Sequence, residues 1–496
     1  MIYKRESLIY LAFIFLISLF FATRLTTLLQ NSFPYTYDQG RDFLKVEEIV
    51  RYKNPTFIGP TTGIMGLYHG AWWYYYLAIP YILTDGSPTA FAAWVFLTQL
   101  FSTLIFAYFL KKEFGELSAI TFFALVAFSP YFVNMSSFVI NSGFTFPFIL
   151  LLLYSLYNLF KTKRAKFYFL TFLSAGFIWE AEYAFGVFLL PSLVLTLTLL
   201  KKPKEIFKKK NFIFSFLGLL IPLLPRIAFE IKNNFIQTKT LLNFLFKPKL
   251  HNPKPLFISF KERLFQFKDF YLSTFPDIGK IILGLIFLFT TAIAFYKLNK
   301  VLKEDYKRRF LKAALVIILL LFFLSGFYRD NFWANYYEGI QFFFITILSI
   351  SLSFLSKLEK FKRVSLGVFA LILIFGSIST YKKLTTPFKP QGLYVPEYFV
   401  KKLYEENKGK RFCARVYTPP VIPYTWNYLF KYYGRKLNYP EPSDDFVDRK
   451  CYFIIEDESP GFEFRIKKWR EENIPDNSKL IRKEYKYGVT IELREI

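Results

Sequence analysis

The sequence is poor in the residues that most often bind metals or carry out thiol chemistry. Its 496 residues include two cysteines, two histidines and three methionines. No group of Cys, His, Asp and Glu residues has the spacing of a metal site, so we expect neither a bound metal nor a cofactor. Cys413 and Cys451 both lie near the C-terminus, where the sequence allows either a disulfide bridge or two free thiols.

Acidic residues are also scarce, because 37 Asp and Glu residues stand against 64 Lys and Arg residues, a net charge of +27. The basic residues occupy short loops between apolar runs and do not form one continuous face. This distribution is typical of cytoplasmic loops and of contact with anionic lipids. We therefore expect membrane lipids, and not nucleic acid, as partners.

Hydrophobic residues make up 53% of the chain, and most of them fall in runs that match the roughly 20 residues needed to cross a bilayer. The expected fold class is therefore a polytopic α-helical membrane protein in the plasma (inner) membrane. The first run, 10–29, is longer than the hydrophobic region of a signal peptide, and no small-residue cleavage site follows it. Lys4 and Arg5 precede it and predict a cytoplasmic N-terminus.

Alternation between apolar runs and basic loops predicts about eleven membrane helices and an extracytoplasmic C-terminus. The expected spans lie near residues 10–29, 88–110, 117–133, 142–160, 167–184, 186–200, 212–230, 280–297, 311–327, 333–355 and 364–381. The loops expected in the cytoplasm are Lys111–Lys112, Lys161–Arg164, Lys201–Lys210, Lys300–Arg309 and Lys357–Arg363.

Two segments stand outside this pattern. Residues 30–87 form a large first exterior loop within the predicted transmembrane domain, 1–384. Residues 385–496 have shorter apolar runs and charges of both signs, which predicts a small extracytoplasmic α/β domain. Its expected strands are 411–417, 451–455 and 488–493, and its expected helices are 424–433 and 462–472.

The first exterior loop begins with two aspartates beside an arginine, Asp38, Arg41 and Asp42. In one interpretation Asp38 caps a helix from Gln39 to about Tyr52, and Asp42 faces solvent one turn later. In the other, Asp38 is a general base that faces a lipid-linked substrate. Asp42 is the alternative base, and it is also placed to bind an acceptor or to pair with Lys45.

Two helices are expected to lie at the membrane surface in this loop. Phe43, Val46 and Val50 recur at helical spacing and predict an amphipathic interfacial helix. Residues 68–83 are rich in Trp and Tyr, which favour the headgroup region, and predict a half-immersed exterior helix. His69 precedes this stretch, and a lone histidine is more often a surface hydrogen-bonding group than a catalyst.

Charged residues gather at three other predicted outer helix ends. Arg226 and Lys232 end the 212–230 span, either as interfacial anchors or as phosphate ligands. Arg329 and Glu338 precede or begin the 333–355 span and are interpreted as rim residues or site residues. Glu180 and Glu182 end the 167–184 span, where pairing with Arg226 or Arg329 is the favoured interpretation.

The stretch Tyr37-Asp38-Gln-Gly-Arg-Asp42, followed by aromatic interfacial helices, resembles the GT-C glycosyltransferases. Within them it is most similar to the bacterial relatives of the protein O-mannosyltransferases and of the aminoarabinose transferase. The stretch matches the loop position at which that family keeps its catalytic aspartate. Tyr68-His69-Gly, with the tyrosines at 74–76, resembles a His/Lys-Pro-x-Tyr-Tyr stretch that lacks its proline here.

Two further stretches resemble the same family. The segment 229–235, which contains Glu230 and Lys232, is similar to a Phe-Glu-Leu-Arg-His-x-Phe signature after the seventh span. Tyr336 and Tyr337 occupy the place of a His-Tyr pair. The exterior loop 129–141 lacks the acidic residue that many relatives carry, a departure that argues against a metal-dependent variant.

The resemblance implies an inverting glycosyltransferase that moves a sugar from a polyprenyl-phosphate-linked donor to a glycan, lipid or protein acceptor. Asp38 would be catalytic, and a set of polar residues would bind substrate: Arg41, Asp42, Tyr68, His69, Arg226, Glu230, Lys232, Arg329, Tyr336 and Tyr337. A polytopic transporter or lipid flippase is the alternative, although we find neither repeated halves nor helices broken near the midplane. A sensor or assembly protein would instead need a binding constellation in the C-terminal region.

Overall fold

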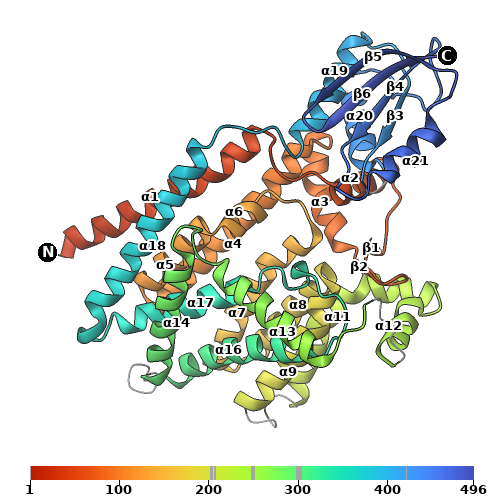
Figure 1. The fold of residues 1–496 in the computed structure, drawn as a ribbon. Coiled ribbons are helices and arrows are strands. Elements are labelled where there is room, and N and C mark those ends of the chain that lie inside the picture. Colours follow the sequence, from red (N-terminus) through yellow and green to blue (C-terminus); the bar gives the residue numbers. More distant parts are fainter. Residues whose placement is uncertain (1, 202–204, 206–207, 247–251, 298–303, 420–421) are drawn as a thin grey trace.

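The structure is a computed structural model that describes all residues except 1, 202–204, 206–207, 247–251, 298–303 and 420–421. Parts of the predicted cytoplasmic loops 201–210 and 300–309 therefore lie outside the described residues. The chain forms a bundle of long helices with a small α/β region at one end, where the C-terminus lies (Figure 1).

Each predicted membrane span overlaps a helix. Seven helices among the described residues are long and apolar enough to cross a membrane, and α5, α14 and α17 are shorter apolar helices. The polytopic α-helical fold class is therefore confirmed. The helices at the predicted spans are α1 (Ile2–Leu29), α4 (Pro88–Phe114), α5 (Glu116–Phe128), α7 (Thr145–Thr162), α8 (Ala165–Ala181), α9 (Tyr183–Leu200), α11 (Lys209–Lys232), α14 (Lys280–Tyr296), α16 (Asp305–Gly326), α17 (Gln341–Leu355) and α18 (Glu359–Thr385).

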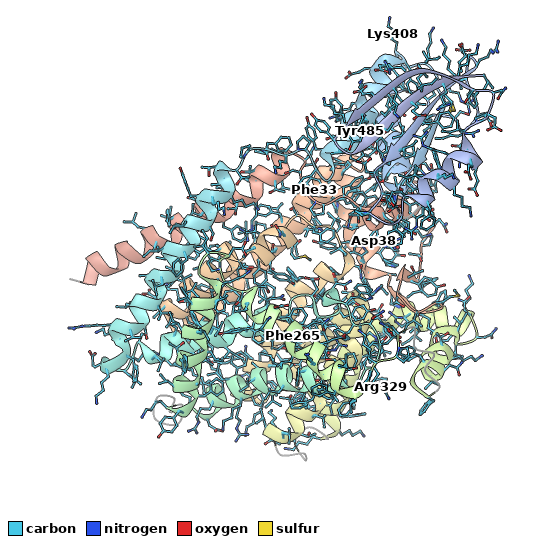
Figure 2. The ribbon with its side chains drawn as sticks, viewed as in Figure 1. Phe33, Asp38, Phe265, Arg329, Lys408 and Tyr485 are labelled. Atoms are coloured by element: carbon cyan, nitrogen blue, oxygen red, sulfur yellow. A yellow bond between two sulfur atoms is a disulfide. The ribbon has the colours of Figure 1, made fainter. Side chains whose placement is uncertain are left out.

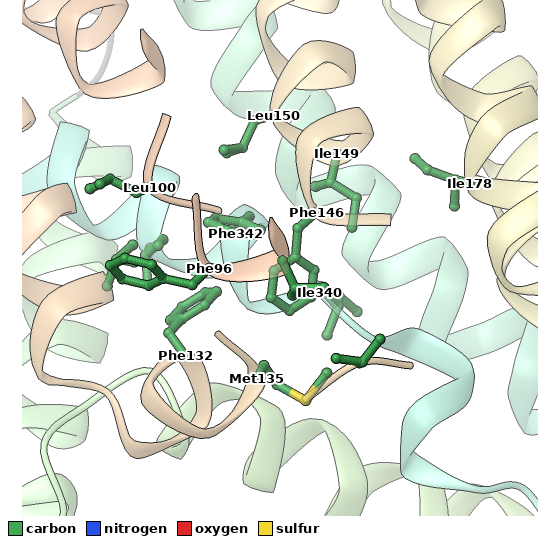
Figure 3. Packing of buried hydrophobic residues seen from close by; sticks show 14 of the residues in the cluster. Phe96, Leu100, Phe132, Met135, Phe146, Ile149, Leu150, Ile178, Ile340 and Phe342 are labelled. Atoms are coloured by element: carbon green, nitrogen blue, oxygen red, sulfur yellow. The ribbon is translucent and has the colours of Figure 1, made fainter. Parts of the chain in front are cut away.

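Phenylalanine rings pack together with leucine, isoleucine and methionine side chains in the buried core (Figure 3). Phe132, Phe146 and Phe342 come from three different helices, and the ring centroids of Phe132 and Phe342 are 4.6 Å apart. Tilted and edge-on ring contacts of this kind add to the free energy of burying the aromatic surface. Many aromatic residues of the sequence thus pack between helices, while others are exposed on the surface of the structure.

Arg24 lies within α1 and is almost completely buried. Its guanidinium donates hydrogen bonds to the carbonyl oxygens of Val126 at 2.9 Å and Ala127 at 3.1 Å. These carbonyls end α5, where helix geometry leaves them without partners and where the helix dipole favours a cation. This charge inside the first span is therefore explained by a contact between α1 and α5.

Short elements connect the long helices on the side of the first exterior loop. The predicted exterior helix at 68–83 begins four residues later than expected, because 68–70 pair as a strand with 58–61. The predicted span at 333–355 is helical only from Gln341, after a 3-10 turn. The short elements are α2 (Tyr37–Val50), β1 (Ile58–Thr61), β2 (Tyr68–Gly70), α3 (Trp72–Thr84), α6 (Pro130–Met135), η1 (Asn141–Phe144), α12 (Ile236–Phe246), α13 (Leu256–Leu272) and η2 (Ala334–Tyr337).

The C-terminal region contains a four-stranded sheet with strand order β3-β4-β6-β5. Strands β3 and β4 are parallel, and the other two pairs are antiparallel. Cys413 and Cys451 directly precede the paired residues Ala414 and Tyr452, and the two cysteines form a disulfide bridge. The elements are α19 (Tyr394–Glu406), β3 (Ala414–Tyr417), α20 (Tyr424–Leu437), β4 (Lys450–Glu456), α21 (Phe464–Asn473), β5 (Lys479–Lys486) and β6 (Val489–Glu495).

Helix α2 packs against α20 of the C-terminal region, and this contact corrects one expectation. Phe43 and Val46, predicted to face the membrane surface, are fully buried, and the ring of Phe43 lies 5.2 Å from that of Tyr428. Tyr35 donates a hydrogen bond to the carbonyl oxygen of Thr425 at 3.0 Å. The apolar face of α2 is therefore covered by protein and not by lipid.

Candidate active site

A cavity of about 780 Å³ lies beside the first turn of α2. Its wall combines side chains from the first exterior loop with side chains from α9, α12, α16 and the segment before α17. Five of the predicted site residues line it: Asp38, Arg41, His69, Arg329 and Tyr336. The view with side chains shows Asp38 near the junction with the C-terminal sheet region (Figure 2).

Asp38 is not the helix cap, so that interpretation of its role is wrong. Helix α2 begins at Tyr37 and its N-cap residue is Thr36. The side-chain oxygen Oε1 of Gln39 accepts hydrogen bonds from the backbone N–H and the hydroxyl of Thr36, at 2.7 and 2.8 Å. Because Thr36 and Gln39 form the capping box, the Asp38 carboxylate, which is 45% exposed, is free to face the cavity.

Arg41 connects the two aspartates of this helix. Its guanidinium lies 2.8 Å from Oδ1 of Asp38 and donates through Nε to Oδ1 of Asp42 at 2.9 Å. A planar guanidinium has several donors in fixed directions, so one arginine can hold two carboxylates. Arg41 therefore fixes the orientation of Asp38 at the cavity wall.

Asp42 is buried, which contradicts the expectation that it faces solvent. Its carboxylate accepts a hydrogen bond from Nε1 of Trp73 at 2.8 Å as well as from Arg41. Lys45, its predicted partner, pairs with Glu48 instead, at 2.7 Å. Burial raises the pKa of Asp42 to about 6 against the opposing effects of Arg41 and Trp73. Asp42 supports Arg41 and does not line the cavity.

His69 also differs from its expected place at the surface. It lies in β2, is buried, and its Nδ1 accepts a hydrogen bond from the backbone N–H of Tyr183 at 3.4 Å. Burial, together with the charges of Arg226 and Arg41, lowers its pKa to about 3. The imidazole is therefore neutral and contributes a polar, uncharged group to the cavity wall.

The predicted pairing of Arg226 with Glu180 is observed, at 2.7 Å. The guanidinium also donates to the carbonyl oxygen of Tyr68 at 2.8 Å and to Oε1 of Gln237 at 2.7 Å. These bonds join α11, α8, β2 and α12 behind the cavity. Neither Arg226 nor Tyr68 is among the residues that line it.

Glu230 lies on α11 and caps the next helix. Its two carboxylate oxygens accept the backbone N–H groups of Gln237 at 2.9 Å and Thr238 at 2.8 Å. These groups belong to the first turn of α12 and have no partner within the helix, and the helix dipole also favours an anion there. Lys232 is exposed at the C-terminal end of α11, away from the cavity wall.

The segment before α17 supplies two residues that line the cavity and one that is buried in the protein core. Arg329 lines the cavity and donates through Nε to the carbonyl oxygen of Lys254 at 2.8 Å. Tyr336 lines the wall, whereas Tyr337 is fully buried and its hydroxyl donates to the carbonyl oxygen of Leu321 at 3.1 Å. The structure thus separates the two tyrosines that the sequence treats as a pair.

Other cavity residues had no role in the sequence-based site. Glu182, predicted to pair with an arginine, instead lines the wall, as does Asn141. An apolar part of the wall comes from distant segments: Val187, Phe188, Leu241, Phe244, Leu324 and Phe327. Among the described residues, no group of three or more His, Cys, Asp and Glu side chains is arranged to hold a metal ion.

Comparison with solved structures identifies the fold. ArnT from Cupriavidus metallidurans in the apo state matches with a TM-score of 0.60 and 11% identity, over 99% of this chain and 98% of that chain. The same protein bound to undecaprenyl phosphate matches with a TM-score of 0.58 and 10% identity, over 98% of each chain. No protein-family model and no curated protein matches the sequence. The chain therefore has the GT-C fold, as predicted.

Proposed function

We propose that this protein is an inverting glycosyltransferase. It would transfer a sugar from a polyprenyl-phosphate donor to an acceptor hydroxyl at the outer face of the plasma membrane. One observation carries the proposal: Asp38 is held by Arg41 at the wall of a cavity that is polar beside α2 and apolar beside α12 and α16. Such a cavity suits a ligand with a polar head and an apolar tail. The fold is shared with ArnT, which has been solved with undecaprenyl phosphate bound.

In this mechanism Asp38 accepts the proton of the acceptor hydroxyl. The acceptor oxygen forms a bond to the anomeric carbon while the bond from that carbon to the phosphate oxygen breaks. The configuration inverts, and polyprenyl phosphate leaves with the bonding electrons. Arg41 holds Asp38 in one orientation through their 2.8 Å contact, and this preorganisation reduces the ordering required before reaction.

The leaving phosphate needs a cation, and Arg329 is best placed among the residues suggested by the sequence. Arg329 lines the cavity beside the apolar wall, whereas Arg226 is engaged by Glu180. A guanidinium binds phosphate oxygens through two parallel hydrogen bonds and stabilises the charge that develops on the leaving group. The apolar side chains of α12 and α16 would contact the first units of the polyprenyl chain.

The test is Asp38→Asn in membranes supplied with a panel of undecaprenyl-phosphate sugars. Removal of a general base typically lowers the rate by about 10²–10⁴-fold, and we expect a loss of that size with normal expression. The matched control is Glu48→Gln on the same helix, which breaks only a half-exposed pair with Lys45 and should keep full activity. A wild-type rate for Asp38→Asn would exclude Asp38 as the base, and the absence of transfer with every sugar would count against the proposed enzyme class.

A further inference from the structure

Glu182 is a buried carboxyl group that the mechanism above leaves unused. It lies at the corner between α8 and α9, is 3% exposed and lines the cavity. Glu180, two residues earlier, is ion-paired with Arg226, but no ion pair among the described residues includes Glu182. Glu182 is the N-cap residue of α9, where its carboxyl group interacts with the backbone N–H of Ala184. No cation in the described part of the chain balances this buried group, and its place at the cavity wall makes it available to a polar ligand.

Hydrogen bonds place this corner beside the helix that carries Asp38. Gln39 of α2 donates through Nε2 to the carbonyl oxygen of Val139 at 2.8 Å. Two residues further, Asn141 donates through Nδ2 to the carbonyl oxygen of Ala181 at 2.8 Å. The segment 139–141 thus bridges α2 and the α8–α9 corner. Asp38 and Glu182 therefore belong to one polar part of the cavity.

The same corner is also tied to the neutral histidine. The backbone N–H of Tyr183 donates to Nδ1 of His69 at 3.4 Å, so His69 and Glu182 are neighbours in the wall. One turn further along α9, the wall becomes apolar at Val187 and Phe188. The change from polar to apolar side chains along α9 parallels the change from sugar to polyprenyl chain in the proposed donor.

We propose that Glu182 binds the sugar of the lipid-linked donor by hydrogen-bonding to a ring hydroxyl. This inference rests on the proposed function and deepens it, because it assigns sugar recognition to a residue separate from the base. Buried carboxyl groups that hydrogen-bond to a ligand hydroxyl discriminate strongly against ligands that lack it, since the protein group is then left unpaired. Glu182 is thus a specificity residue, while Asp38 acts on the acceptor.

Binding of two lipids to the purified full-length protein tests this assignment. The probes are undecaprenyl phosphate and, from the panel above, the undecaprenyl-phosphate sugar that wild type binds most tightly. Loss of a hydrogen bond to a buried carboxyl group should weaken binding of the sugar lipid to Glu182→Ala by about 10- to 100-fold. Binding of undecaprenyl phosphate should change by less than about twofold. Glu182→Gln keeps a hydrogen-bonding group and should recover part of the loss.

Glu180→Gln is the matched control, since it breaks a structural ion pair. This variant should weaken the binding of both lipids equally or lower the melting temperature of the protein. Unchanged binding of the sugar lipid by Glu182→Ala would overturn the inference. The inference would also be overturned if Glu182→Ala weakened the binding of both lipids equally. The same holds if the wild-type protein bound no sugar lipid more tightly than undecaprenyl phosphate. Binding is measured without acceptor, so a protein that binds the sugar lipid through Glu182 but never transfers the sugar would contradict only the proposed reaction.

Discussion

Asp38 and Asp42 lie one helical turn apart on α2, but their environments are opposite. The side chain of Asp38 is 45% exposed at the cavity, whereas that of Asp42 is 1% exposed beneath Arg41. The sequence places both on one helical face, and it cannot show the burial of Asp42 because that depends on Trp73 from α3. Of the two, only the exposed carboxylate can meet an acceptor.

The burial of Asp42 should make the stability of the folded protein depend on pH. Burial raises its pKa from 3.8 to about 6, so between these values the folded protein keeps a proton that the unfolded chain has lost. The contribution of Asp42 to stability therefore falls as the pH rises from about 4 to 6 and is constant above that window. Asp42→Asn cannot titrate, and its melting temperature should rise relative to wild type across the same window. Thermal unfolding in detergent at several pH values measures this.

If the melting temperatures of Asp42→Asn and wild type differed by a constant amount from about pH 4 to 8, Asp42 would not take up a proton in this range. Transfer activity gives a second comparison. Asp42→Asn keeps Asp38 as the base and disturbs only the contact of Asp42 with Arg41, which orients Asp38. We expect a smaller loss of transfer than for Asp38→Asn.

Helix α2 is held between the helical bundle and the C-terminal region, and Gly40 lies where the backbones of α2 and α20 approach closely. A Cβ atom added at Gly40 would lie 2.4 Å from the backbone nitrogen and 2.7 Å from Cα of Thr425. Both atoms belong to the backbone of α20 and cannot rotate away. The position of Asp38 therefore depends on how closely α20 approaches the first turns of α2.

Gly40→Ala should force α2 and α20 apart. Overpacking of a buried contact typically costs about 1–3 kcal/mol, so we expect a lower melting temperature and reduced transfer with expression retained. The control is Gly367→Ala in α18, where no heavy atom lies within 4 Å of the added Cβ. Equal melting temperatures for the two variants would mean that the two helices do not pack as closely as the structure shows.

The segment 229–235 shows how a motif can be structural. Glu230→Ala removes the carboxylate that caps α12, and loss of an N-terminal cap typically costs about 1 kcal/mol. We expect faster amide hydrogen exchange in Ile236–Phe246 of Glu230→Ala, measured by mass spectrometry. In the control variant Lys232→Ala, exchange in this helix should equal that of wild type. Weaker donor binding by Glu230→Ala without faster exchange in α12 would instead favour the substrate-binding role that the family resemblance suggested.

Local patterns in the sequence predicted the membrane helices well, but they did not predict α12, α13 or α19, and they predicted the long-range contacts poorly. The membrane helices follow from apolar runs, because burial in lipid and in the bundle needs the same composition. Strand β5 was missed, since Lys479–Lys486 is mostly charged and exposed. In the site, Leu241 and Phe244 of α12 could not be anticipated, because their place depends on how residues 231–279 fold back over the bundle.

The C-terminal region and the first exterior loop form one continuous contact, which ties the location of Asp38 to that of the C-terminus. The backbone N–H groups of Leu393 and Tyr394 donate to the carbonyl oxygens of Phe33 at 3.1 Å and Asn31 at 2.8 Å. Tyr428 donates to the carbonyl oxygen of Gly86 at 2.5 Å. Both regions must therefore lie on the same side of the membrane.

The topology prediction follows from this contact and from the distribution of basic loops, which places residues 385–496 outside the cytoplasm. A reporter active only in the cytoplasm, fused after Ile496, should give no signal. The disulfide between Cys413 and Cys451 supplies an independent measurement, because such bonds persist in oxidising compartments and are rare in the cytosol. Unreduced, denatured protein should resist alkylation at both cysteines, and reduction should expose both. A strong reporter signal together with free thiols would place Asp38 in the cytoplasm, where a donor in the outer leaflet could not reach it.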